Sequence, residues 1–254
     1  MRSGFRGFPP EAITFFRSLA RHNTREWFQP RKHIYEEQVK APMIELVTEL
    51  DRAMLEFAPD YVTDANKAIY RIYRDTRFSP DKTPYKTHIA AIFARRGTQK
   101  HGAGGYYFSI SHTEVEVGGG IYMPPPEALL AVRTHIAQRH ADFRRIAASS
   151  AIKRLFGAVQ GAQLARVPKG FSVEHPAADL LRFKQYLLFT TLDPAVVTTP
   201  RLLPELEKRF RAMAPFLDFL NAPLLAVKRR APPSIDDRLF QRGATSGNPR
   251  SLPS

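Results

Sequence analysis

The sequence predicts an α+β protein, in which an antiparallel sheet of about four strands in residues 68–122 is packed between N-terminal and C-terminal helices. Hydrophobic residues recur at helical spacing in the first and last parts of the chain. The middle part instead holds short β-branched or aromatic runs that are separated by turn residues, which is typical of strands. Because these runs follow one another closely, we expect antiparallel pairing.

Three helices are expected ahead of the sheet. Pro10 opens the first, because proline in a first helical turn loses no hydrogen bond that the helix needs. Asn23 with Glu26 three residues later has the form of a capping box, which predicts the start of the second helix. Apolar residues at helical spacing predict a third helix from about Pro42 to Phe57.

The four strands are expected at residues 68–74, 86–95, 105–112 and 115–122. Two groups of glycines, in residues 102–105 and 118–120, are interpreted as hairpin turns and bulges, because neither group lies between a strand and a helix in a nucleotide-binding pattern. Glu114 and Glu116 share one face of a strand, and we interpret them as a solvated edge that discourages aggregation.

Helical spacing returns after the sheet, in residues 129–156 and in an amphipathic segment at residues 206–220. Residues 179–190 fit neither pattern. We expect one domain over residues 1–227. Residues 228–254 are rich in Pro, Ser, Arg and Gly and are predicted to form a mostly disordered basic tail.

Composition excludes several classes of function. The 254 residues include no cysteine, so disulfides, thiolate zinc sites and cysteine nucleophiles are excluded. The eight histidines lack the spacing of a metal site, and no nucleotide-binding or serine-hydrolase motif is present, so we expect neither a metal nor a cofactor. No apolar run reaches the roughly 18 residues of a membrane span, and the expected location is the cytoplasm.

Positive charge is concentrated in one segment. The formal net charge is +14, and residues 66–101 contribute nine lysines and arginines against two aspartates. Such a charge favours an anionic partner. Within this segment Pro80 and Pro84 stiffen residues 71–88, so the cations are expected to be held in place before a ligand arrives. The predicted ligand-binding residues are Arg71, Arg74, Asp75, Arg77, Asp81, Lys82, Tyr85 and Lys86, with Arg182 and Lys184 as outer contributors.

Two classes of function remain open. The first is a site for a phosphorylated or carboxylated small molecule, in which Asp75 or His88 moves a proton if the protein is an enzyme. The second is a nucleic-acid-binding module without sequence specificity that uses the same basic loop. Asp75 and Asp81 within the basic run favour the first, because they would repel an extended phosphate chain. A third interpretation is a solvated hairpin, in which Arg74 and Arg77 only pair with these aspartates.

The run R-D-x-R-F-S-x-D-K-x-P-Y-K at residues 74–86 resembles the central motif of an uncharacterised family of bacterial and fungal proteins, known as a domain of unknown function. Residues 7–9, 23–28 and 168–184 resemble further parts of the pattern of this family. The resemblance covers roughly residues 5–222. It implies a single domain and supplies no activity.

Overall fold

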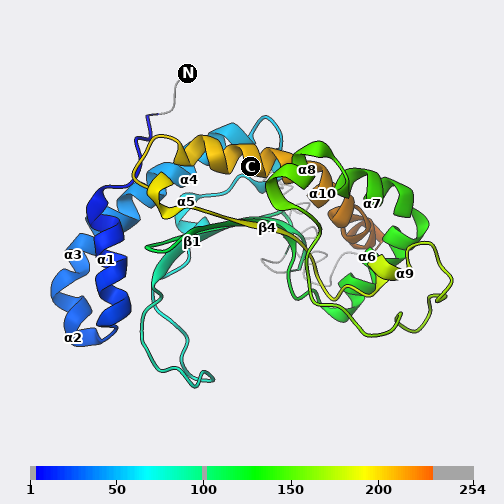
Figure 1. Ribbon diagram of the computed structural model, residues 1–254, viewed down its shortest axis with the longest axis horizontal. Coiled ribbons are helices and arrows are strands. Elements are labelled where there is room, and N and C mark those ends of the chain that lie inside the picture. Colours follow the sequence, from blue (N-terminus) through cyan, green and yellow to red (C-terminus); the bar gives the residue numbers. More distant parts are fainter. Residues whose placement is uncertain (1–3, 99–101, 231–254) are drawn as a thin grey trace, which may run out of the picture.

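The computed structural model describes residues 4–98 and 102–230, and it confirms the α+β class. A four-stranded antiparallel sheet has the order β1-β2-β3-β4. Helices α4 (Ala41–Met54), α8 (Ser150–Phe156) and α10 (Leu202–Arg230) lie over one face of the sheet (Figure 1). The helices of residues 10–34 lie at one end of the molecule, and those of residues 126–147 and 178–181 lie at the other. The molecule is therefore an arch, and the second face of the sheet is open on its underside.

The strands are β1 (His88–Ala94), β2 (Gly105–Ser111), β3 (Val115–Ile121) and β4 (Tyr186–Leu192). The first three confirm the strands predicted after residue 86. The strand predicted at residues 68–74 is wrong, because this segment begins in a helical turn, α5 (Ala65–Ala68), and bends at Ile72. It meets the sheet only through isolated bridges, between Ile69 and Ala91 and between Tyr73 and Tyr85. The fourth strand is β4, most of which lies in residues 179–190, the segment that fitted neither pattern.

The glycines of residues 118–120 have a role other than the predicted one, whereas Gly102 lies in a turn, as predicted. Gly118, Gly119 and Gly120 lie inside β3 and not in a turn. A Cβ at Gly119 would come within 2.9 Å of the Met213 sulfur, so glycine is what allows α10 to pack closely on the sheet. Gly105 begins β2.

The core lies between the sheet and the helices above it. The Phe210 ring of α10 lies 4.8 Å from that of Tyr106 and 5.6 Å from that of Phe93, measured between centroids. All three side chains are buried, as are Met213 and Leu217 on the same helix. Burying this many large apolar groups is the main stabilising contribution to such a fold.

The N-terminal part folds into a helical layer. It comprises α1 (Pro10–Arg21), α2 (Arg25–Phe28), the 3-10 turn η1 (Gln29–Arg31), α3 (Lys32–Ile34), the π-helical segment η2 (Tyr35–Lys40), α4 (Ala41–Met54) and η3 (Pro59–Tyr61). Pro10 opens α1 as predicted. The capping role predicted for Asn23 is wrong, because the hydroxyl of Thr24 caps α2 by accepting from the Trp27 N–H.

The C-terminal part comprises α6 (Pro126–Gln138), α7 (His140–Ala147), α8 (Ser150–Phe156), α9 (Ala178–Leu181), η4 (Pro194–Val196) and α10 (Leu202–Arg230). The first three confirm the helical pattern of residues 129–156. Helix α10 continues to Arg230, three residues into the predicted tail. Residues 231–254, the rest of that tail, lie outside the described residues. No helix in the described part of the chain is long and apolar enough to cross a membrane.

Candidate functional site

The basic segment forms a hairpin that projects below the sheet from the β1 edge (Figure 1). Its two arms are joined by backbone hydrogen bonds from Arg74 to Pro84 (2.9 Å) and from Lys86 to Ile72 (2.8 Å). At the tip the Lys82 ammonium donates to the Thr76 carbonyl (2.9 Å). The hairpin is therefore held by its own polar groups.

The arginines of this hairpin bind its aspartates. Arg77 donates to both carboxylate oxygens of Asp75, at 3.0 and 2.8 Å, and Arg74 donates to Asp81 and to Thr83. Hydrogen bonds from Arg77 lower the pKa of Asp75 to about 2, and those from Arg74 lower the pKa of Asp81 to about 2. Asp75 is consequently a charged partner of Arg77 at neutral pH and is poorly suited to proton transfer.

The predicted cations do not converge. Arg74 lines a small cavity of about 240 Å³ beside Arg25 and Tyr73, while Lys86 lines a different cavity on the sheet. The side chains of Arg71, Arg77 and Lys82 are exposed, and so is that of Phe78 at the tip, at 92%.

Tyr85 belongs to the framework of the hairpin. Its ring stacks on Phe28 with 4.1 Å between centroids, and its side chain is buried. The side chain of Asn23 donates to the Tyr85 carbonyl (2.9 Å) and accepts from the Tyr85 N–H (3.1 Å). Asn23 and Phe28 thus fix the position at which the hairpin joins the helical layer.

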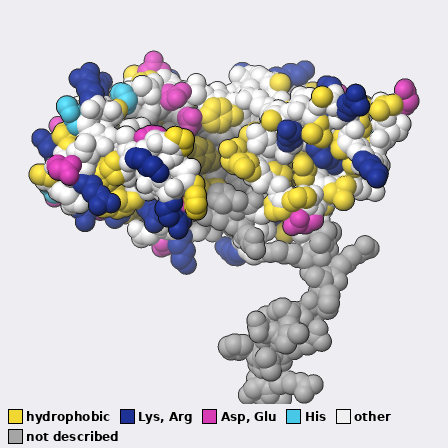
Figure 2. Space-filling view, turned by 90° about the horizontal axis from the view of Figure 1, so that it is seen from below, with side chains coloured by type: hydrophobic (Ala, Val, Ile, Leu, Met, Phe, Trp, Pro, Cys, Tyr) yellow, Lys and Arg dark blue, Asp and Glu magenta, His cyan; other side chains and the backbone are white. Residues whose placement is uncertain are grey.

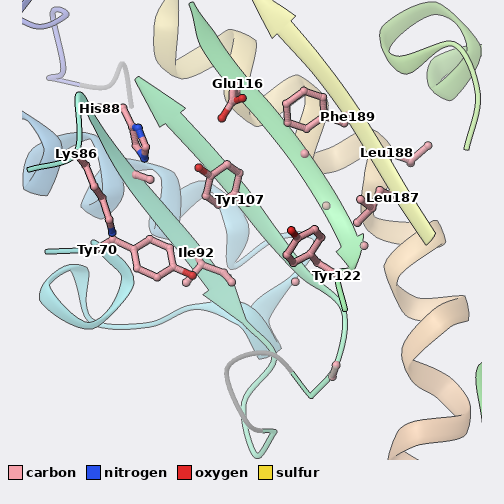
Figure 3. Close-up of a pocket in the computed structure, with 16 residues that line it drawn as sticks. Tyr70, Lys86, His88, Ile92, Tyr107, Glu116, Tyr122, Leu187, Leu188 and Phe189 are labelled. Carbon is pink, nitrogen blue, oxygen red and sulfur yellow. The ribbon is translucent and has the colours of Figure 1, made fainter. Parts of the chain in front are cut away.

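A cavity of about 550 Å³ lies on the open face of the sheet. Side chains alternate between the two faces of a strand, and several residues that face this side are small, namely Ala90, Gly105, Gly118 and Gly120. Gly105 on β2 pairs with Gly120 on β3, so neither strand has a side chain at this cross-strand position. The walls are aromatic and apolar (Figure 3), with Tyr70, Ile92, Tyr107, Tyr122, Leu187 and Phe189 around the floor.

Charged or titratable groups reach this cavity from both sides of β2, from Lys86 and His88 on one side and from Glu116 on the other. Lys86 lies just before β1 and places its ammonium 4.9 Å from the centre of the Tyr70 ring. His88 follows on β1, and Glu116 lies on β3, where one carboxylate oxygen accepts from the buried hydroxyl of Ser109 at 2.8 Å. In Figure 3 the Tyr107 ring lies between the Lys86 side and the Glu116 side of the cavity.

Burial and neighbouring charges set the protonation of these groups. Partial burial, assisted by the charge of Lys86, lowers the pKa of His88, and the more weakly acting charge of Glu116 opposes this. His88 is therefore neutral at pH 7. Burial raises the pKa of Tyr107, as it does that of Tyr70, so both phenols are protonated hydrogen-bond donors.

Arg182 and Lys184 lie away from the basic hairpin. They precede β4, whose first residue, Tyr186, pairs with the last residue of β3, whereas His88 is the first residue of β1. In this antiparallel register the two ends are opposite corners of the sheet. The structure does not bring these two predicted contributors to the Lys86 end of the cavity.

The sequence pattern of a family of conserved hypothetical proteins, DUF2461, matches residues 11–219. The match begins in α1, covers the hairpin and all four strands, and ends within α10. The chain belongs to DUF2461. No curated protein sequence matches it. Membership of DUF2461 confirms the family resemblance and assigns no activity.

The residues predicted from the sequence include the basic side of the cavity, and the rest of its lining was not predicted. Lys86 and His88 were predicted site residues, but Glu116 was interpreted as a solvated edge and Gly118 and Gly120 as turn residues. These three alternate along β3 and therefore share one face. That alternation is the signal in the sequence that points to a hollow with a carboxylate beside it. Within the described part of the chain, no three His, Asp or Glu side chains gather as metal ligands would.

Proposed function

We propose that this DUF2461 protein binds a small organic molecule that carries an anionic group, a carboxylate or a phosphate, in the cavity on the open sheet face. The observation that carries the proposal is the position of Lys86. Within the described part of the chain it is the one lysine or arginine that lines this apolar cavity. A charge beside apolar walls attracts an oppositely charged group more strongly than it does in water.

Size and shape support a small molecule as the ligand. A volume of about 550 Å³ falls in the range of ordinary ligand sites, which are mostly apolar with a few polar groups. The aromatic rings of Tyr107 and Phe189 face the space above the floor and offer flat surfaces for a ring or a chain (Figure 3). The hydroxyl groups of Tyr70 and Tyr107 are additional donors to an anionic group.

The proposal keeps the class of ligand that the sequence predicts and changes the residue that holds the ligand's charge. Arg74 and Arg77 are engaged by Asp81 and Asp75, so a ligand would have to displace carboxylates that are already in place. Lys86 is at the cavity, and the neutral His88 beside it adds no competing positive charge.

The test uses substitutions at two lysines. A library of aromatic carboxylates and aryl phosphates is screened against the protein by thermal shift, and hits are titrated by two-dimensional NMR. We expect Lys86→Met to weaken the hits by roughly tenfold or more, because a charged hydrogen bond contributes about 1.5–3 kcal/mol. Lys184→Met, which removes the same charge at an exposed position, should leave the affinities unchanged.

The Arg74→Ala, Arg77→Ala double variant separates this proposal from a site on the hairpin. Binding that survives in Lys86→Met and is lost in the double variant would refute the cavity and favour the basic hairpin as the anion site.

A further inference from the structure

We infer that the ligand of the sheet cavity carries two groups of opposite character, the anionic group near Lys86 and an amine or other cationic nitrogen that Glu116 binds. This inference rests on the proposed function and specifies its ligand. It starts from a carboxylate in the wall of a mostly apolar cavity.

Glu116 is held in a defined position. It pairs with Ser109 across β2 and β3, and the Ser109 hydroxyl, in a residue only 3% exposed, donates to one of its carboxylate oxygens at 2.8 Å. A buried serine that anchors a carboxylate fixes its direction, which a solvated surface glutamate does not need. Its side chain lines the cavity (Figure 3), and its charge acts on the pKa of both His88 and Tyr107.

The charge of Glu116 has no cationic partner at ion-pair distance among residues 4–98 and 102–230. His88, the histidine of the cavity lining, is neutral at pH 7 and does not supply one. A half-buried carboxylate with a single neutral hydrogen-bond donor is incompletely compensated. A ligand nitrogen with hydrogens to donate is the chemical group that would complete it.

Strand geometry separates the two charged ends of the site. Lys86 leads into β1 and Glu116 lies on β3, with β2 between them. Strands in a sheet are about 4.8 Å apart, so the two strands are roughly 10 Å apart. A ligand that binds both Lys86 and Glu116 therefore carries its acid and its amine at opposite ends. The part of the ligand between these two groups would lie over Ala90 and Gly118, beside Tyr107. An α-amino acid, with both charges on adjacent atoms, does not fit this arrangement.

Three probes with a common ring test the inference: 4-(aminomethyl)benzoate, which has both charges, 4-methylbenzoate, which has only the acid, and 4-methylbenzylamine, which has only the amine. Affinities are measured by NMR titration on the full chain. We expect 4-(aminomethyl)benzoate to bind roughly tenfold more tightly than 4-methylbenzoate. Glu116→Gln should abolish this preference and leave the affinity for 4-methylbenzoate equal or higher.

Glu114→Gln is the matched control, because it removes the same charge from the turn before β3 and outside the cavity lining. It should keep the full preference. Ser109→Ala is a second variant, which retains the carboxylate and releases its anchor, and it should reduce the preference without abolishing it. This variant keeps the test decisive if Glu116→Gln does not fold.

Two results would overturn the inference: equal binding of 4-(aminomethyl)benzoate and 4-methylbenzoate, or a preference that survives in Glu116→Gln. Either can occur while Lys86→Met still weakens 4-methylbenzoate, in which case the proposed function stands and only its second charged group is refuted. If Lys86→Met leaves the affinity for 4-methylbenzoate unchanged, the proposed function is refuted instead. Failure of all three probes to bind at millimolar concentration would contradict both.

Discussion

Two asparagine side chains each hold both backbone polar groups of a residue far away in the sequence. Asn23 binds the N–H and carbonyl of Tyr85, and Asn221 binds those of Gly104, at 2.7 and 3.0 Å. A carboxamide is suited to this because it carries one acceptor and two donors side by side. Each asparagine thereby attaches a helix to the segment just before a strand, Asn23 to the segment before β1 and Asn221 to the segment before β2.

Removing the Asn23 carboxamide tests how much this attachment contributes. Asn23→Ala leaves the Tyr85 N–H and carbonyl without their partners, in a part-buried position. We expect the free energy of unfolding to fall by about 2 kcal/mol, at about 1 kcal/mol for each hydrogen bond. Urea denaturation measures it. Asn66→Ala, at an exposed asparagine, is the control, and equal effects of the two substitutions would contradict the role of Asn23.

Asp51 predicts a specific dependence of stability on pH. Burial raises its pKa to about 6, and its carboxylate accepts only a long hydrogen bond, 3.4 Å, from the Thr63 N–H among the described residues. The folded protein thus binds this proton more tightly than the unfolded chain does. The contribution to stability is complete below pH 4 and is lost as the pH rises through about 6.

Asp51→Asn removes this titration. The variant should match the natural protein near pH 4 and exceed it by about 1–3 kcal/mol at pH 8, where the natural side chain is charged. Urea denaturation at a series of pH values gives the difference curve. A difference that stays constant from pH 4 to pH 8 would show that Asp51 titrates normally.

At the scale of the element, the basic hairpin contains two ion pairs of different kinds. The pair between Arg77 and Asp75 joins residues two apart at the exposed tip, whereas Arg74 links its own arm to Asp81 and Thr83 on the other. Exposed local pairs contribute little to stability, and pairs that cross between chain segments order more of the structure.

We therefore expect Arg77→Ala to leave the melting temperature unchanged and Arg74→Ala to lower it by roughly 2–4 °C. Differential scanning calorimetry measures both, and limited proteolysis should show faster cleavage of the hairpin only in Arg74→Ala. If Arg77→Ala lowered the melting temperature as much as Arg74→Ala, the ion pair at the tip would stabilise the fold, and this expectation would be wrong.

The elements that sequence reasoning placed correctly are those whose pattern is local. Helix α1 begins at Pro10, and β1 to β3 are short alternating runs between turns. Strand β4 reads Tyr-Leu-Leu-Phe-Thr-Thr-Leu, which is apolar on both faces at its start, because one face meets the core and the other lines the cavity. Alternation is absent from such a strand, so its period does not identify it. Residues 68–74 have the composition of a strand, but the segment begins in the last turn of α5 and bends at Ile72, so composition alone does not identify its structure.

At the scale of the whole molecule, the arch determines where a ligand can bind. An apolar stripe on α10 predicts that the helix is buried, but not which face of the sheet it covers. All of the covering helices lie on one face, so the opposite face stays open and carries the cavity that we propose as the site (Figure 1). The cavity floor is made of Ala90 and glycines, which carry no chemical group that sequence reasoning could recognise as functional. The domain limits predicted at residues 1–227 remain a prediction.

The distribution of charge over the whole molecule also predicts how the protein binds nucleic acid. The net charge of +14 is that of the full chain, and on the underside the Lys and Arg side chains lie mainly toward the two ends, with hydrophobic side chains between them (Figure 2). Several arginines are engaged by carboxylates, among them Arg74, Arg95 and Arg144. On this face the described residues form no continuous basic track, so we expect weak binding that is driven by counterion release and does not depend on the nucleic-acid sequence.

Fluorescence anisotropy with single-stranded and duplex oligonucleotides, each in two unrelated sequences, measures this from about 50 to 300 mM salt. The logarithm of the affinity should fall linearly with the logarithm of salt concentration, with the same slope for both sequences. Phe78→Ala should have no effect on duplex binding, because the exposed ring has no base to stack on in a closed helix. A preference for one sequence that persists at high salt would contradict this expectation. A loss of single-strand binding in Phe78→Ala would identify the hairpin as a nucleic-acid contact. The nucleic-acid alternative would then displace the cavity as the main function, because an aromatic ring between cations is the arrangement that holds an unpaired base.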